Sequence, residues 1–154
     1  MAKQYWLMKS EPDVYSIDDL EKEGSTCWEG VRNYKARNNM QAMKIGDEVI
    51  YYHSNAKPPG AVGVARVCKL AYPDHFALKK GHKYFDAKSD PEKPRWFMVD
   101  VEFVGKFDDI VGLPALKADA ALADMELIRY GRLSVQSVKN AEFTRVKKMA
   151  GYRG

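Results

Sequence analysis

Residues 28 to 40 read Trp28-Glu29-Gly30-Val31-Arg32-Asn33-Tyr34-Lys35-Ala36-Arg37-Asn38-Asn39-Met40. Asn33 is a residue type that caps helices, so the stretch predicts a helix from Tyr34 to Met43. Ala36, Met40 and Met43 form an apolar stripe at helical spacing, which would pack on a core. A second stripe at the same spacing is polar and aromatic, and it comprises Tyr34, Arg37, Asn38 and Gln41. This second face either contacts a ligand or is simply solvated, and periodicity does not distinguish the two.

The length and composition around this stretch are those of a globular protein. The chain has 154 residues, which predicts one domain over residues 1–154. Its net charge of +4 is compatible with a nucleic-acid partner but too small for a strong nonspecific binder. No apolar run approaches the ~20 residues that span a bilayer, and the first residues lack a signal-peptide core. We therefore expect no membrane partner and a cytoplasmic location, or a nuclear one in a eukaryote.

The sequence lacks the usual arrangements of catalytic and metal-binding residues. Cys27 and Cys68 are expected to be reduced core residues rather than a disulfide. His53, His75 and His82 lie apart without ligand spacing, so we expect neither a metal nor a cofactor. Phosphate loops, dinucleotide-binding loops, hydrolase elbows and the zinc-deaminase signature are missing. The chain is therefore not expected to be an enzyme.

Short strands separated by helices predict a mixed α+β fold, either a small barrel or a curled mixed sheet. Aromatic and alternating segments predict strands over residues 3–9, 48–54, 61–70, 96–104 and 133–138. In the second of these, Val49, Tyr51 and His53 would point to one side, and Ile50, Tyr52 and Ser54 to the other. Gly63 indicates a bulge or a close approach within its strand.

Helices and loops complete the expected chain. Ser16 favours a helix start and Gly24 its end, whereas residues 114–117 and 119–122 predict helical turns. Ser137 is a plausible cap for a C-terminal helix with a basic exposed side. Residues 72–95 are rich in proline, lysine and aspartate and predict a long basic surface loop, either functional or merely solvated.

Several residues near strand ends and turns have side chains suited to a nucleobase. Trp28 and Tyr34 offer rings on which a base could stack, at ~1–3 kcal/mol per base. Small polar groups suited to a Watson–Crick edge are Ser10, Asn33, Asn38, Ser54 and Ser134. Arg32, Lys35 and Arg37 could hold phosphates, and Glu11 could accept a hydrogen bond from an exocyclic amine. Alternatively, Trp28 is a core residue, Ser10 belongs to a turn, and Glu11 is solvated or pairs with Arg32.

Motifs in order along the chain resemble the EVE domain. They are residues 5–12, 28–34, 46–47, 52–54, 84–86, 88–89, 94–96 and 132–136. The resemblance implies a PUA-like fold, related to YTH and ASCH domains, with a curled β-barrel of about five or six strands flanked by helices. It also implies a binding module whose pocket accepts a modified base, either a modified cytosine in DNA or a modified base in RNA.

The same resemblance implies which residues form the site. The base pocket would comprise Ser10, Glu11, Trp28, Val31, Arg32, Asn33, Tyr34, His53, Ser54, Arg132, Leu133 and Ser134. Lys35, Arg37 and Asn38 would contact phosphates, and the expected partner is modified DNA or RNA bound by a monomer or weak dimer. Lys35 stands where the family usually has Gln, and Ser137 where it usually has Pro.

Two other functions remain open at this point. The chain could be a sensor of a free nucleoside or other small molecule that acts through a partner protein. Less favoured is an RNA-modifying hydrolase, in which Glu11 or His53 would be the acid or base, because no activated nucleophile can be assembled.

Overall fold

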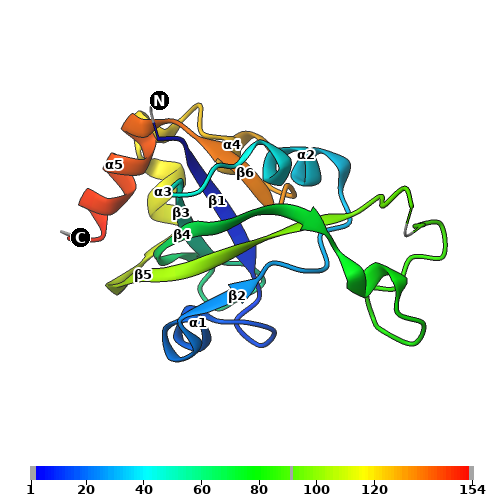
Figure 1. Ribbon diagram of the computed structural model, residues 1–154. Helices are drawn as coiled ribbons and strands as arrows, with labels where there is room; N and C mark the ends of the chain where they lie inside the picture. The colour runs from blue at the N-terminus through cyan, green and yellow to red at the C-terminus, as the bar shows by residue number, and fades with distance from the viewer. Residues whose placement is uncertain (1–2, 91, 153–154) are drawn as a thin grey trace.

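Six strands form one sheet in the order β2-β5-β4-β3-β1-β6 in the computed structural model, which describes residues 3–90 and 92–152 (Figure 1). The strands are β1 Tyr5–Ser10, β2 Ser25–Cys27, β3 Glu48–His53, β4 Gly60–Pro73, β5 Phe97–Gly112 and β6 Val135–Val138. The helices are α1 Ile17–Glu23, α2 Tyr34–Ala42, α3 Leu113–Ala118, α4 Glu126–Arg129 and α5 Asn140–Met149, with 3₁₀ turns at His75–Leu78 and Ala120–Leu122. The predicted α+β fold, a curled sheet of five or six strands flanked by helices, is confirmed.

Both faces of the sheet are buried, which the central strand β3 shows best. Val49 and Tyr51 belong to one core, beneath α1 and α2, whereas Ile50 and Tyr52 belong to the other, beneath α3 and α5. Successive side chains of a strand point to opposite faces, so this separation confirms the alternation predicted for β3. Strand β1 pairs with β3 in parallel, and the other neighbours are antiparallel.

Helix α2 forms as the opening stretch predicts. The Asn33 Oδ1 accepts a hydrogen bond from the backbone N of Ala36 at 2.9 Å, which caps the first turn. Ala36, Met40 and Met43 are buried in the core, so the apolar stripe is confirmed. Asn39 adds a tie between elements, because its Nδ2 donates to the backbone O of Val135 at 2.7 Å. The helix is thereby fixed against the start of β6.

The prediction that Ser137 caps the last helix is wrong. Strand β6 continues to Val138, and Lys139 is the cap residue of α5. The backbone N and the Oγ of Ser137 instead donate to the carboxylate of Glu126, at 3.1 and 3.0 Å. Pairing with β1 keeps residue 137 extended, since Trp6 and Ser137 are partners in the antiparallel register.

Strand pairing also explains elements that exceed their predicted bounds. Strands β4 and β5 pair from Gly60 with Gly112 to Pro73 with Phe97, so both run further than their alternation indicates. The short edge strand β2 pairs with β5 and had no signal of its own. The pairing of β4 shifts its register next to Gly63 with both neighbouring strands, β3 and β5. A Cβ at this position would lie only 2.5 Å from the Gly105 O. Both expectations for Gly63, a bulge and a close approach, are confirmed.

The two cysteines are free thiols, as expected, but neither is fully buried. Their prediction as core residues is therefore wrong, because β2 is an edge strand and Cys68 lies where β4 leaves the core. No helix in residues 3–90 and 92–152 is long and apolar enough to cross a membrane.

We expect Asn33→Ala to lower the free energy of unfolding by ~1 kcal/mol, because the first turn of α2 loses its cap. Asn33→Asp is the matched control, since a carboxylate at this position still accepts from the Ala36 N and suits the positive end of the helix. Urea denaturation measures both variants. Equal losses in the two variants would contradict a capping role for Asn33.

Candidate functional site

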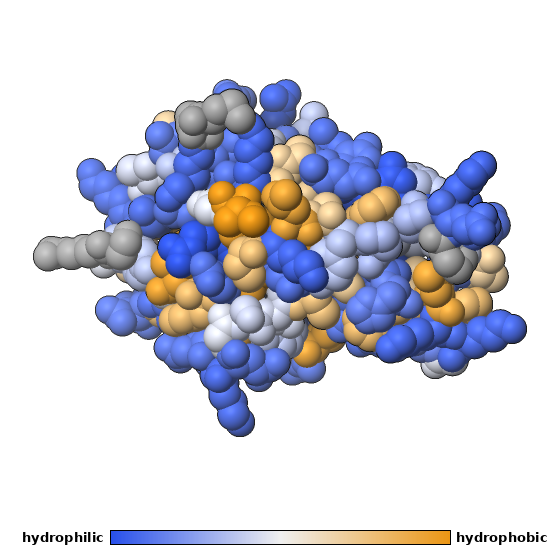
Figure 2. All heavy atoms as spheres, viewed as in Figure 1, coloured by the Kyte–Doolittle hydropathy of each residue, from blue (hydrophilic) through white to orange (hydrophobic). Residues whose placement is uncertain are grey.

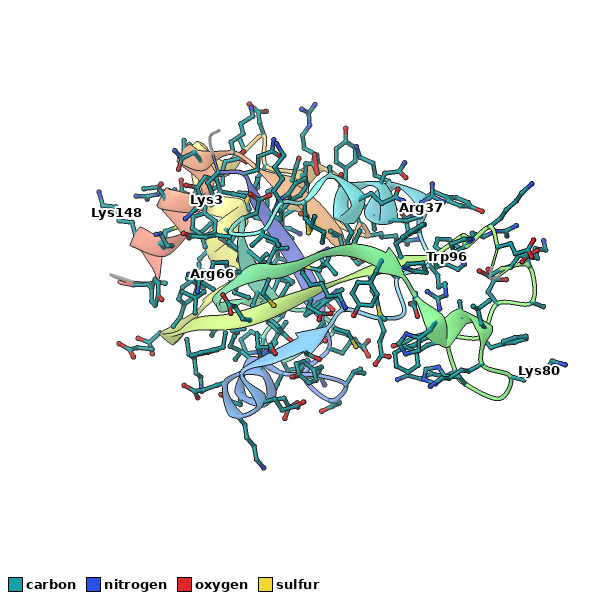
Figure 3. All side chains as sticks on the ribbon, in the orientation of Figure 1. Lys3, Arg37, Arg66, Lys80, Trp96 and Lys148 are labelled. Atoms are coloured by element: carbon teal, nitrogen blue, oxygen red, sulfur yellow. The ribbon has the colours of Figure 1, made fainter. Side chains whose placement is uncertain are left out.

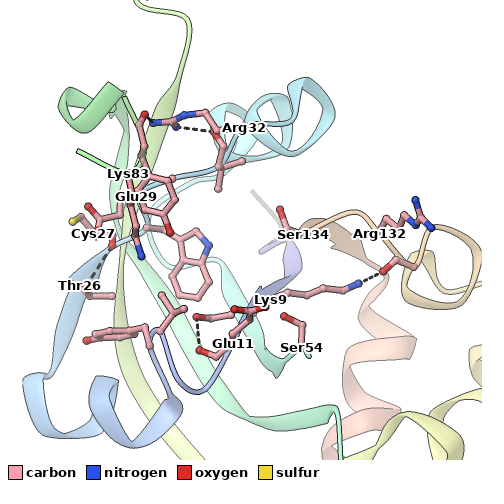
Figure 4. Close-up of a pocket in the computed structure, with 18 residues that line it drawn as sticks. Lys9, Glu11, Thr26, Cys27, Glu29, Arg32, Ser54, Lys83, Arg132 and Ser134 are labelled. Carbon is pink, nitrogen blue, oxygen red and sulfur yellow. Dashed lines mark hydrogen bonds between the residues drawn. The ribbon is translucent and has the colours of Figure 1, made fainter. Parts of the chain in front are cut away.

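A cavity of about 540 Å³ opens between the ends of three strands and the segment that precedes α2 (Figure 4). Its lining comprises Lys9, Ser10, Glu11, Val14, Tyr15, Thr26, Cys27, Trp28, Glu29, Gly30, Val31, Arg32, Ser54, Lys83, Tyr84, Gly131, Arg132 and Ser134. The volume falls within the roughly 300–1,000 Å³ typical of small-ligand pockets. The cavity therefore has room for a planar heterocycle with its sugar.

One wall is built by the sheet and presents hydroxyl groups. Strands β1 and β3 end side by side, and the backbone N of Ser54 donates to the Ser10 O at 3.1 Å. The backbone N of Lys9 donates to the Ser134 O at 2.9 Å, which brings the approach to β6 to the same edge. Three serines from distant parts of the chain thus meet. Ser54 and Ser134 offer hydroxyls that no described side chain engages.

The opposite wall is the segment from Thr26 to Arg32. Trp28 is only 7% exposed, and its ring packs edge-on against Tyr51 with centroids 5.4 Å apart. Gly30 has a φ of 81°, and a Cβ there would overlap the ring of Tyr84. Glycine is therefore required at position 30 both by its backbone conformation and by the close approach of Tyr84.

Arg32 and Asp74 join this wall to the excursion that follows β4. The Asp74 carboxylate is fully buried and accepts from the Arg32 Nη1 at 3.0 Å and from the Gly30 N at 2.9 Å. Its other oxygen accepts from the Phe76 N at 3.0 Å. The Arg32 Nη2 donates to the Tyr84 O at 2.6 Å. One ion pair thus holds the two halves of the wall together.

A row of aromatic rings and guanidinium groups extends outward from this ion pair. Arg32 lies 5.6 Å from the ring centroid of Tyr84 and 5.5 Å from that of Trp96. Trp96 stacks on Tyr34 with centroids 5.0 Å apart, and Arg37 lies 4.7 Å from the Tyr34 ring. Figure 3 shows Arg37 and Trp96 close together, where α2 meets the start of β5. This row of rings and guanidinium groups leads from the cavity wall to the surface of the protein.

The family model described as EVE domain matches residues 4–149. The chain belongs to the EVE domain family. Thymocyte nuclear protein 1 of Homo sapiens is 40% identical over 158 residues, which cover 90% of this chain and 70% of the human protein. A hypothetical protein from Leishmania major has a structure with a TM-score of 0.95 and 49% identity, covering 97% of this chain and 96% of that one. The human THYN1 protein, crystallised with DNA containing 5-methylcytosine, gives a TM-score of 0.93 and 38% identity, covering 99% of this chain and 100% of that one.

In this EVE domain the cavity contains most, but not all, of the residues predicted for the base pocket. Eight of the twelve line it, namely Ser10, Glu11, Trp28, Val31, Arg32, Ser54, Arg132 and Ser134. Asn33, Tyr34, His53 and Leu133 do not line it. The Glu11 Oε1 accepts from Asn55 Nδ2 at 2.9 Å, so Glu11 is not the partner of Arg32.

The other four have partners elsewhere. Asn33 caps α2, and Tyr34 is 52% exposed beside Trp96. Leu133 packs against the core beneath α2. The His53 Nε2 accepts from the backbone N of Ile17 at 3.1 Å. Burial lowers the pKa of His53, which favours the neutral ring that this hydrogen bond requires.

The three predicted phosphate contacts lie on the exposed side of α2, outside the cavity lining. The Arg37 guanidinium is occupied, because it donates to the Asn38 Oδ1 at 2.9 Å and to the Arg95 O at 3.1 Å. Lys35 makes no hydrogen bond or ion pair within residues 3–90 and 92–152. Of the two cations among them, Lys35 is therefore the more available to a ligand.

Residues that the sequence did not single out also line the cavity. Glu29 lies between Trp28 and Val31, which were predicted as pocket residues, and in the sequence it resembles a solvated charge. In the structure it lines the cavity, and its Oε2 is buried. Lys83 and Tyr84 come from the excursion at residues 74–96, predicted as a loop that could be functional or solvated. The glycine at position 30 is a sequence signal for a turn or a close approach, but it does not identify Tyr84 as the neighbour.

Arg32→Ala should lower the free energy of unfolding by ~3 kcal/mol, because it leaves the buried Asp74 carboxylate without its countercharge. Arg66→Ala is the control, since Arg66 pairs with Glu102 at 2.7 Å on the surface and such pairs contribute at most ~1 kcal/mol. Urea denaturation of both variants measures the difference. A loss no larger for Arg32 than for Arg66 would show that the ion pair does not hold the wall.

His53 should make the fold less stable as the pH falls from about 7 to 5. Burial lowers the pKa of His53 in the folded state. Below the pKa of an unfolded histidine, the unfolded chain therefore binds a proton more readily than the folded one, and acid favours unfolding. The contribution is thus complete above pH ~6.5 and lost on acidification. Urea denaturation at several pH values measures it, and His53→Gln should flatten the slope. An unchanged slope in the variant would assign the effect to other groups.

Proposed function

We propose that the chain is a reader of modified nucleic acid that holds one flipped or single-stranded base in its cavity. The observation that carries this proposal is the likeness to the human THYN1 protein, whose structure contains DNA with 5-methylcytosine. That likeness extends over 99% of this chain at 38% identity. The first ligand to test is therefore 5-methylcytosine in DNA, with modified RNA as the second.

The two walls of the cavity suit the parts of a nucleotide. The rings of Trp28 and Tyr84 line the side formed by the segment before α2 and the excursion, and they offer faces for stacking. The serine hydroxyls of the opposite wall can donate to or accept from the base edge. Figure 4 shows Lys83 on the first side and Arg132 and Ser134 on the second, with the open cavity between them.

Cations at the rim can hold the backbone on either side of the inserted base. Lys83 and Arg132 line the cavity, and both are exposed. Lys35 lies further out, on α2. A few phosphate contacts of this kind give moderate, salt-dependent affinity, in agreement with the net charge of +4. The protein in this proposal is a binding module rather than an enzyme, working in the cytoplasm, or in the nucleus if the organism is a eukaryote.

A single-stranded oligonucleotide with one central 5-methylcytosine should bind more tightly than the same strand with cytosine, as measured by fluorescence anisotropy. The logarithm of the binding constant should fall with the logarithm of salt concentration, with a slope of about −0.7 per phosphate contact. A protein that binds only the free nucleoside, with no salt dependence, would instead be a nucleoside sensor. Equal affinity for every modified and unmodified strand and nucleoside, DNA and RNA, would contradict the proposal.

Trp28→Ala should weaken binding of the modified strand by ~1–3 kcal/mol, because a stacking surface is removed from the cavity. Tyr34→Ala is the comparison, since Tyr34 offers a similar ring outside the cavity. Circular dichroism at the assay temperature confirms that each variant is folded. A larger effect of Tyr34→Ala would place the base on the surface of α2 instead.

A further inference from the structure

One oxygen of the Glu29 carboxylate is buried and has no hydrogen-bond partner in the part of the chain that the structure describes. Glu29 lines the cavity, next to Trp28 and Gly30. A buried carboxylate oxygen without a donor is costly, and native structures rarely leave one without a partner. No donor to either oxygen of Glu29 is found within residues 3–90 and 92–152, so a molecule that reaches this side chain from the cavity meets an unengaged acceptor.

Two other carboxylates near the cavity already accept hydrogen bonds from the protein. The Glu11 Oε1 accepts from Asn55, and the Asp74 carboxylate accepts from Gly30, Arg32 and Phe76. Lys83 lines the same cavity, but its ammonium lies over the Tyr84 ring at 4.9 Å and forms no ion pair with Glu29. Among these three carboxylates, Glu29 is the one that accepts no hydrogen bond from the part of the chain that the structure describes.

The backbone on both sides of Glu29 is fixed. The Trp28 N donates to the Val99 O at 2.8 Å, and the Gly30 N donates to the Asp74 Oδ2 at 2.9 Å. The ring of Tyr84 packs directly over Gly30. Because neither neighbour can move easily, the backbone of Glu29 is held at the cavity wall, and only its side-chain torsions need to be ordered when it accepts a hydrogen bond.

We infer that Glu29 reads the exocyclic amino group of the inserted base. This inference rests on the proposed function and narrows its ligand to amino-bearing bases, those of the cytosine or adenine type. A carboxylate is the group that accepts from the N4 amine of cytosine. A carbonyl at the same place, as in thymine, would put two acceptor oxygens against each other, and its binding would be penalised.

Matched pairs of bases that differ in this group test the inference directly. 5-Methylcytosine and thymine share the methyl group and the ring, and they differ by an amine in place of a carbonyl, with the ring nitrogen protonated accordingly. Cytosine with uracil and adenine with hypoxanthine form equivalent pairs. Each base is placed at the centre of the same labelled single strand, in DNA and in RNA, and anisotropy titration gives the dissociation constants for the wild type.

The wild type should prefer the amino member of at least one pair by roughly 5- to 100-fold, the range expected for one good base contact. Glu29→Gln should reduce this preference to about 2-fold or less, because an amide can rotate to donate to a carbonyl or accept from an amine. Glu21→Gln makes the same chemical change on an exposed residue of α1 and should leave the preference unchanged. Glu29→Gln should also fold at least as stably as the wild type, since it removes a buried unpaired charge.

Two results would overturn the inference while leaving the proposed function in place. One is a wild type that binds modified strands but does not discriminate within any pair. The other is a preference for the amino member that persists in Glu29→Gln. A wild type that binds none of the strands would overturn the proposed function itself, and the inference with it.

Discussion

The buried carboxylate of Asp74 is the group on which the cavity depends. It receives three donors from two segments, through the Gly30 N, the Arg32 guanidinium and the Phe76 N, so segments about 44 residues apart in sequence share one anchor. A charge in the interior is tolerated only when it is surrounded by such donors. The sheet provides one wall independently, whereas in the other wall Asp74 joins the segment before α2 to the excursion, beside the hydrogen bond from the Arg32 Nη2 to the Tyr84 O. The outline in Figure 1 shows the result, an excursion that leaves the end of β4, extends beyond the sheet and returns at β5.

Sequence patterns were sufficient for most of the sheet, for two helix caps and for two serines of the hydroxyl wall. These features depend on local spacing, which a sequence displays directly. They are the alternation along β3, the caps at Ser16 and Asn33, and the strand ends at Ser10 and Ser54. The family resemblance supplied the approach to β6 as well. Ser137 was misassigned because pairing with a distant strand overrode a local capping preference.

The wall that contains Glu29, Lys83 and Tyr84 could not be predicted in the same way. Whether Glu29 is solvated or buried depends on a tertiary contact between Gly30 and Tyr84, 54 positions apart, which no local pattern encodes. Tyr34 shows the converse, because a residue with the right chemistry and spacing lies outside the cavity, against Trp96. Figure 2 shows that the face seen in Figure 1 is mostly hydrophilic, with hydrophobic side chains gathered near its middle.

The position of Trp96 has a consequence for how such a domain can diversify. Asp74 and Trp96 lie at the two ends of the excursion. The Asp74 N donates to the Trp96 O at 2.9 Å, so this hydrogen bond closes the base of the excursion. Lys80, near the tip, points away from the body of the molecule in Figure 3. Insertions and deletions next to Lys80, between Phe76 and Tyr84, can therefore leave the sheet, α2 and the contacts of Asp74 in place while they alter the rim of the opening. The same scaffold can thus acquire different rims, and with them different contacts around a bound ligand, by changes of loop length alone.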